Sequence, residues 1–117
     1  MGQVTLHKRG DGTKPPAELG NPSEWGVAAI KVGDSAGSFT ALGCIGASGG
    51  TWCYGSELTT DGKYCYSNYY HASKSHKSTV KIGGTTFSSG WVEAGRYAYA
   101  QWTGGGAQVC YTYYSID

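Results

Sequence analysis

A short basic segment in the second half of the chain carries the residues best suited to chemistry. It places two histidines and two lysines beside a pair of tyrosines: Tyr69, Tyr70, His71, Lys74, His76 and Lys77. Side chains of this kind can donate charge-assisted hydrogen bonds to phosphate groups. We therefore predict that this segment contacts a target or a partner. The alternative is that each histidine has a structural or surface role.

The two histidines are poorly spaced for sharing a metal ion. His71 and His76 lie five positions apart, so on one continuous strand their side chains point to opposite faces of the sheet. A metal site needs ligands that converge on one point. The sequence therefore predicts no metal and no other cofactor.

Catalysis would need a nucleophile next to a base, a pair of carboxylates or an open metal site. The sequence has no local motif for any of these, and Cys53 lacks a patterned base to activate it. We therefore expect a protein that is not an enzyme.

The composition predicts the elements that must position these residues. A chain of 117 residues makes one domain of ordinary size. Its 20 glycines, 10 tyrosines and 4 tryptophans favour twisted sheets and tight turns, because aromatic residues fit pleated surfaces and glycine destabilises helix interiors. We expect a chain that is nearly all β.

The charge and hydropathy patterns exclude two classes of partner. Nine Lys and Arg residues against eight Asp and Glu residues leave a formal net charge of +1, which is not the broad basic surface that nucleic acid binding requires. The longest apolar stretch, residues 27–30, is far too short to cross a bilayer. We expect neither nucleic acid binding nor a membrane span.

Four cysteines form an even set without the paired spacing of a zinc ribbon: Cys44, Cys53, Cys65 and Cys110. Two disulfides are therefore expected, which implies an oxidising compartment and a secreted, extracellular protein. The first residues lack a basic region followed by an apolar one, so we expect a mature chain with an added initiator methionine.

The pairing of the cysteines depends on how the neighbouring strands align. If the residues between Cys53 and Cys65 include a long loop, these two cysteines lie side by side, and Cys44 is left to pair with Cys110. If residues 61–62 instead form a two-residue hairpin turn, Cys53 does not face Cys65. We prefer the loop, although four cysteines allow three connectivities.

Residues 1–24 differ from the rest of the chain and are predicted to form an extended or disordered arm ahead of a domain at 25–117. The segment contains all three prolines, among them Pro15 and Pro16, and almost no apolar periodicity. Val4 and Leu6 alternate with polar residues, so the arm could dock on the edge of a partner's sheet. The alternative is a flexible leader.

The remaining strands follow from alternation and glycine breaks. Residues 25–32 and 38–42 read as a hairpin around a turn at 33–37. In a long strand at 91–102, small residues such as Ala98 share one face and Tyr97 and Tyr99 share the other. These tyrosines could cover a sandwich or form an exposed aromatic surface. Further strands are expected near 51–54, 64–70, 78–82 and 108–116.

Several motifs, in order, resemble the lactococcin 972 bacteriocin family over about residues 50–117. They are residues 50–55 (GTWCYG), 66–80 (YSNYYHASKSHKSTV), 94–100 (AGRYAYA) and 111–114 (YTYY). The resemblance implies a small antiparallel β-sandwich and a secreted antibacterial protein. It also implies action on cell-wall synthesis through the lipid II precursor, without pore formation. The cysteines and the arm are additions to the family pattern.

Two functions follow from these features. The first is a bacteriocin-like toxin of interbacterial competition, which recognises an envelope target of a competing bacterium directly through residues 69–77. The second is an adaptor subunit of a larger secreted toxin assembly, in which residues 2–24 dock a partner protein. The edge strands of a small sandwich would also permit a homodimer.

Overall fold

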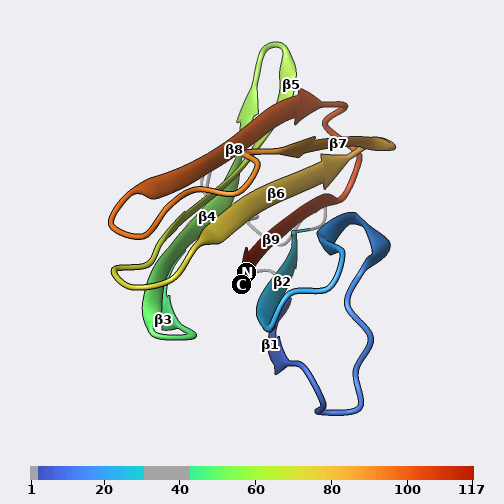
Figure 1. Ribbon diagram of the computed structural model, residues 1–117. Coiled ribbons are helices and arrows are strands. Elements are labelled where there is room, and N and C mark those ends of the chain that lie inside the picture. The colour runs from blue at the N-terminus through green and yellow to red at the C-terminus, as the bar shows by residue number, and fades with distance from the viewer. Residues whose placement is uncertain (1–2, 31–42) are drawn as a thin grey trace.

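Two antiparallel sheets pack face to face in the computed structural model, which describes residues 3–30 and 43–117 (Figure 1). The five-stranded sheet has the order β1-β2-β9-β6-β7 and the four-stranded sheet the order β3-β4-β5-β8. The elements are β1 (Gln3–Lys8), η1 (Ala17–Leu19), β2 (Glu24–Ile30), β3 (Gly43–Ala47), β4 (Gly50–Thr59), β5 (Gly62–Tyr70), β6 (His76–Ile82), β7 (Thr85–Ser88), β8 (Tyr97–Gly104) and β9 (Cys110–Ile116). The prediction of a small antiparallel β-sandwich with two disulfides is confirmed.

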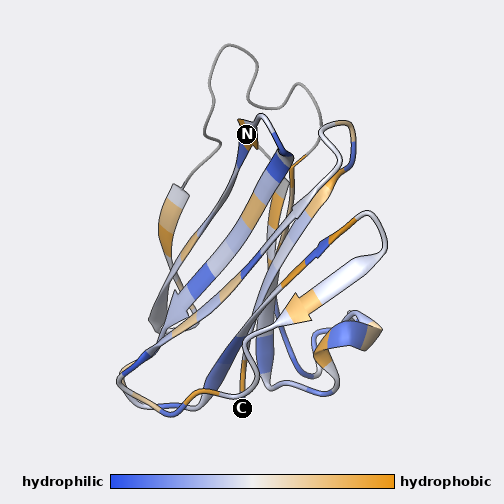
Figure 2. Cartoon of the chain, turned by 90° about the horizontal axis from the view of Figure 1, so that it is seen from above, coloured by the Kyte–Doolittle hydropathy of each residue, from blue (hydrophilic) through white to orange (hydrophobic). Residues whose placement is uncertain are grey.

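Alternation along the strands builds the interior between the two sheets. Every second residue of β5 from Lys63 to Tyr69 is buried, and the residues between them are only half-buried. Hydrophobic and hydrophilic residues alternate along several strands (Figure 2). The main core contains Trp52, Tyr69 and Tyr114 as its largest aromatic side chains. Such period-two burial is what a sheet with one covered face requires.

A second, smaller core lies on the outer face of the five-stranded sheet. The segment between β1 and β2 carries the short helix η1 and places Leu19 against Trp25 and Tyr113. Glu18 of η1 accepts a hydrogen bond from Lys81 of β6 at 2.7 Å. This contact holds the pKa of the Glu18 carboxyl below its usual value. The segment is therefore packed on the sandwich.

The predicted arm includes an edge strand of this chain's own sheet. β1 pairs antiparallel with β2, and Val4 packs partly against the main core. Leu6 is about half exposed, at 48%. Pro15 and Pro16 are half-buried immediately before η1. Docking of these residues on a partner and a domain boundary at residue 24 stay predictions.

The predicted disulfide pairing is wrong. Cys44 is bonded to Cys53, and Cys65 is bonded to Cys110. The reason is the register: β4 and β5 are joined by a tight turn at residues 60–61, so Cys53 faces Asn68 across the ladder. The expected long loop is absent there, and Cys53 lies directly opposite Cys44 of β3.

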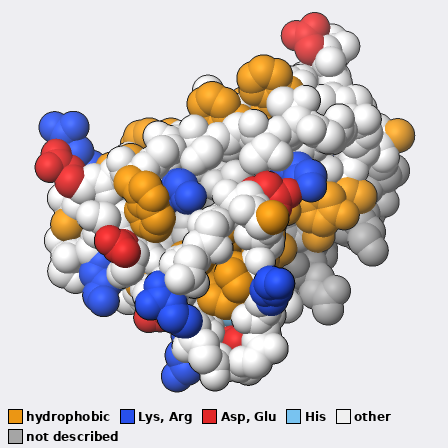
Figure 3. Space-filling model, turned by 45° about the vertical axis from the view of Figure 1, so that its right-hand side comes forward, with side chains coloured by type: hydrophobic (Ala, Val, Ile, Leu, Met, Phe, Trp, Pro, Cys, Tyr) orange, Lys and Arg blue, Asp and Glu red, His pale blue; other side chains and the backbone are white. Residues whose placement is uncertain are grey.

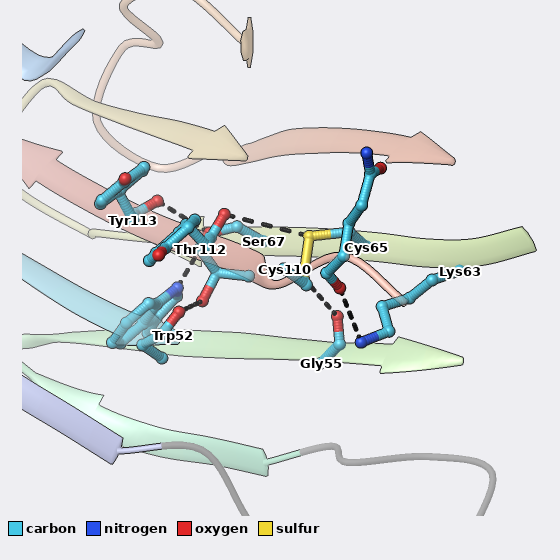
Figure 4. The surroundings of a disulfide bond; sticks show 11 residues. Trp52, Gly55, Lys63, Cys65, Ser67, Cys110, Thr112 and Tyr113 are labelled. Carbon is cyan, nitrogen blue, oxygen red and sulfur yellow. Dashed lines mark hydrogen bonds between the residues drawn. A yellow bond between two sulfur atoms is a disulfide. The ribbon is translucent and has the colours of Figure 1, made fainter. Parts of the chain in front are cut away.

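The disulfide between Cys65 and Cys110 joins the two sheets through the core (Figure 4). Beside it, the indole of Trp52 donates a hydrogen bond to the hydroxyl of Ser67 at 2.9 Å. Ser67 in turn donates to the carbonyl of Tyr113 at 2.8 Å. The buried polar groups of Trp52 and Ser67 are thus satisfied, the first within the four-stranded sheet and the second by a contact between the two sheets.

The strand predicted at 91–102 begins later than expected. β8 starts at Tyr97, and residues 91–96 form an irregular segment in which Gly95 has a φ of 88°. Backbone in the left-handed region interrupts a strand, and glycine adopts it without strain. β3 and β7 were not predicted. The expected turn at 33–37 and strand at 38–42 lie outside the described residues.

The two disulfides should differ in their effect on stability. They close segments with sequence separations of 9 and 45 residues. Loop-closure entropy then predicts that the free energy of unfolding falls by about 4 kcal/mol when Cys65 and Cys110 are both replaced by Ala. The same double replacement of Cys44 and Cys53 should lower it by about 2.7 kcal/mol. Urea denaturation measures both. Non-reducing peptide mapping that finds Cys53 joined to Cys65 would contradict the pairing itself.

Candidate functional site

Two irregular segments meet at one end of the sandwich, where the chain passes from β5 to β6 and from β7 to β8. The amide of Gly95 donates to the carbonyl of His71 at 2.8 Å, and His76 and Val92 exchange two backbone hydrogen bonds of 3.0 and 2.7 Å. The corresponding loops lie together in Figure 1. We name residues 71–77 and 91–96 the loop end.

His71 fixes the loop from inside the protein. Its Nδ1 accepts hydrogen bonds from the backbone amides of Ser73 (3.1 Å) and Lys74 (3.0 Å). An amide N–H can only donate, so Nδ1 carries no proton and the ring N–H lies on Nε2. Nε2 donates to the carbonyl of Ser48, 3.0 Å away. The His71 ring therefore ties the loop to the turn between β3 and β4.

His76 is fully buried at the start of β6 and also binds backbone. Its Nδ1 lies 2.8 Å from the carbonyl of Lys74, and its Nε2 contacts the carbonyl of Arg96. Carbonyl oxygens only accept, so a neutral ring satisfies one of them and a ring with two N–H groups satisfies both. Either form connects the two segments of the loop end.

Tyr69 completes the internal support. Its ring stacks on Tyr114 with the centroids 4.4 Å apart and an interplanar angle of 7°. Its hydroxyl donates to the carbonyl of Ala47 at 2.7 Å, and burial raises its pKa. A Cβ at Gly50 would lie 2.6 Å from that hydroxyl, so glycine leaves the room that the contact needs.

The cationic side chains of the loop end lie outside this framework. Lys74 and Arg96 are exposed, and Lys77 is half-buried with its Nζ 4.9 Å from the centroid of the Trp91 ring. Partial burial lowers the pKa of Lys77. Arg96 forms an exposed ion pair of 3.3 Å with Glu93, a kind of contact that contributes little to stability.

The predicted contact residues therefore point in different directions. Tyr69, His71 and His76 lie inside the sandwich, with ring centroids between 5.6 and 6.5 Å apart. Tyr70 lies on the outer face of the four-stranded sheet and Lys77 on that of the five-stranded sheet. The ring nitrogens of His71 and His76 are engaged by the protein's own backbone, whereas the side chain of Lys74 is exposed.

The sequence reasoning missed Trp91 and Arg96. Both were read as members of one long strand, whereas the irregular segment between Gly90 and Gly95 brings them beside residues 71–77. The signal was present in those two glycines, which have φ values of 74° and 88°. Glycines at this spacing are typical of turns.

We searched the described part of the chain for a metal site and for a membrane-spanning helix. No group of three or more His, Cys, Asp or Glu side chains within it could hold a metal ion. Within the same residues, no helix is long and apolar enough to cross a bilayer. On the face shown in Figure 3, charges of both signs are interspersed and hydrophobic side chains form separate patches.

Fold and site together define a small, disulfide-linked β-sandwich protein with a cationic loop end. The family model described as Bacteriocin (Lactococcin_972) matches residues 48–114, more than half of the chain, so the chain belongs to this bacteriocin family. The resemblance inferred from the motifs is confirmed, and the protein is a bacteriocin-like antibacterial protein. Searches for similar curated proteins and similar solved structures found no match.

Removing the Tyr69 hydroxyl tests the internal support. Tyr69→Phe leaves the buried carbonyl of Ala47 without its hydrogen bond, and we expect a loss of about 1–2 kcal/mol in the free energy of unfolding. The matched control is Tyr99→Phe at an exposed position, where we expect a change within about 0.5 kcal/mol. Equal effects of the two substitutions in urea denaturation would contradict this role of Tyr69.

Proposed function

We propose that this bacteriocin-like protein recognises a phosphate-bearing component of the envelope of competing bacteria through the cations of its loop end. The pyrophosphate of lipid II is the candidate target. The observation that supports this proposal is the exposed Lys74, which projects from a loop whose backbone is held by the buried ring of His71. A cation on a fixed loop loses little backbone freedom when it binds, so ordering of its side chain is the main entropic cost.

The chemistry of the loop end suits a phosphate ligand. Lys74 supplies a mobile ammonium group, and Arg96 supplies a planar fork that can bind two phosphate oxygens. The hydrogen bond between the Arg96 carbonyl and His76 holds this residue beside the loop that carries Lys74. The aromatic ring of Trp91, 50% exposed, adds an apolar contact next to the charges.

Charge-removing substitutions test this proposal. Each charge-assisted hydrogen bond contributes about 1.5–3 kcal/mol, so Lys74→Ala and Arg96→Ala should each raise the inhibitory concentration roughly ten- to hundredfold. Binding to vesicles that contain lipid II should weaken in parallel. The control is Lys14→Ala, which removes an exposed cation from the segment between β1 and β2. Unchanged killing and vesicle binding by the Lys74→Ala, Arg96→Ala double variant would refute the proposal.

An adaptor role is the second candidate, and features of β1 favour it. This strand pairs with β2 on one side only, which leaves an edge to which another strand can add. Leu6 is 48% exposed and lines a cavity of about 280 Å³ together with His7, Lys8, Asp11, Glu24 and Ser48. A hydrophobic side chain beside a mixed-charge hollow suits a protein partner.

Copurification from the producing bacterium tests the adaptor role. Deletion of residues 2–24 is a poor test, because it removes β1 and the buried Leu19 together with the proposed contact. Leu6→Glu alters the exposed side chain alone, and Thr5→Glu is the control on the opposite face of the same strand. An adaptor should lose its partner in the first variant and keep it in the second. Recovery of the unmodified protein without a partner would exclude this role.

A further inference from the structure

The outer face of the four-stranded sheet is covered with tyrosines. Tyr70 on β5 lies opposite Tyr97 on β8 across the ladder, and Tyr99 follows two positions further along β8. The same face of β5 also carries two more, Tyr64 and Tyr66. We name these residues the tyrosine face. These tyrosines are distinct from the cationic side chains of the loop end, so phosphate binding there does not explain them.

The tyrosine rings are neighbours, with Tyr97 and Tyr99 exposed and the three tyrosines of β5 half-buried. Ring centroids are 5.3 Å apart for Tyr70 and Tyr97, 5.6 Å for Tyr97 and Tyr99, and 5.8 Å for Tyr64 and Tyr66. Tyr97 is 40% exposed and Tyr99 is 59% exposed. The sequence left open whether these tyrosines were core or surface. They are surface, because Ala98 and Ala100 of the same strand are the residues that face the interior.

The composition of this face indicates the chemistry of its occupant. Along the described strands the other outward residues are hydroxyl, amide, cysteine or glycine residues, and the single charged one is Glu57. The face presents no Lys, no Arg and no aliphatic anchor within these strands. A protein interface of ordinary composition would include arginine or methionine beside the aromatics. A nearly uncharged face of rings and hydroxyls matches a neutral, polyhydroxylated ligand.

A polar atom within this face lacks a partner. The side-chain oxygen Oδ1 of Asn68 is buried and forms no hydrogen bond. Asn68 lies between Tyr66 and Tyr70 along β5 and opposite Tyr99 on β8. Leaving a buried acceptor unpaired costs free energy, and a ligand donor would recover it if the Asn68 side chain turned toward the surface. The acceptor therefore favours a ligand that carries hydroxyl or amide N–H groups.

We propose that the tyrosine face binds the pyranose rings of a neutral polysaccharide. The C–H groups of a sugar ring pack against aromatic faces, while its hydroxyl groups bond to the polar edges that tyrosine and amide side chains provide. Tyrosine supplies this contact area with little loss of conformational entropy, because it has few rotatable bonds. The ring spacings are comparable to the length of one sugar unit in a 1,4-linked chain. Such binding would hold the protein on a glycan surface.

Retention on insoluble chitin and cellulose, followed by titration with chitohexaose and cellohexaose, tests the proposal on the full chain. We expect retention on at least one polymer and a Kd raised at least tenfold in the Tyr97→Ala, Tyr99→Ala double variant. The control is Tyr111→Ala, which removes a tyrosine of similar exposure, 37%, from the outer face of the other sheet. Circular dichroism and intact disulfides confirm that each variant is folded.

The results that would contradict glycan binding differ from those that would contradict phosphate binding at the loop end. Absence of retention on both polymers, or a double variant that binds like the unmodified protein, would overturn the glycan site. So would self-association of the unmodified protein that the double variant abolishes, because the face would then bind a second copy of the chain. The Lys74→Ala variant should retain glycan binding, which keeps the two surfaces distinguishable.

Discussion

The contact between the inward face of β5 and β9 is the constraint on which the rest of the structure depends. Successive inward residues of β5 form a disulfide from Cys65 to Cys110, a hydrogen bond from Ser67 to the carbonyl of Tyr113, and a ring stack of Tyr69 on Tyr114. Because inward residues are two positions apart, a shift of one residue in the register would turn all three toward solvent. The covalent bond, the hydrogen bond and the stack thus specify the same alignment of the two sheets.

This alignment explains why several polar and aromatic residues of the family motif lie inside the protein. Tyr69 and the two histidines extend the β5 contact to the loop end, where His71 and His76 bind backbone of the neighbouring segments. The buried residues of the motif build a frame, and its exposed residues, among them Lys74 and Arg96, lie on the surface of that frame. The loop-end cations and the tyrosine face lie on different surfaces of this frame, so each can change its chemistry without disturbing the core.

The sequence was sufficient for most of the long strands and insufficient for their register. Alternation and glycine breaks located β4, β5, β6 and β9, but the disulfide pairing was wrong because it depended on where one tight turn falls. The histidine spacing could not show which rings are buried, because the chain leaves the strand between them. The two faces of β8 were separated correctly. Ala98 and Ala100 of β8 lie inside because the large rings of the core leave room only for small side chains there. The sequence of β8 alone does not show these neighbours.

Nitrogen-15 NMR of the His71 side chain tests most directly whether this buried ring holds the loop that carries the exposed Lys74. The account predicts a proton on Nε2, none on Nδ1, and amide protons of Ser73 and Lys74 that exchange slowly although their loop is at the surface. A proton on Nδ1, or rapid exchange of both amides, would contradict it. The loop would then lack its internal support, and the preorganised presentation of Lys74 would have no structural basis.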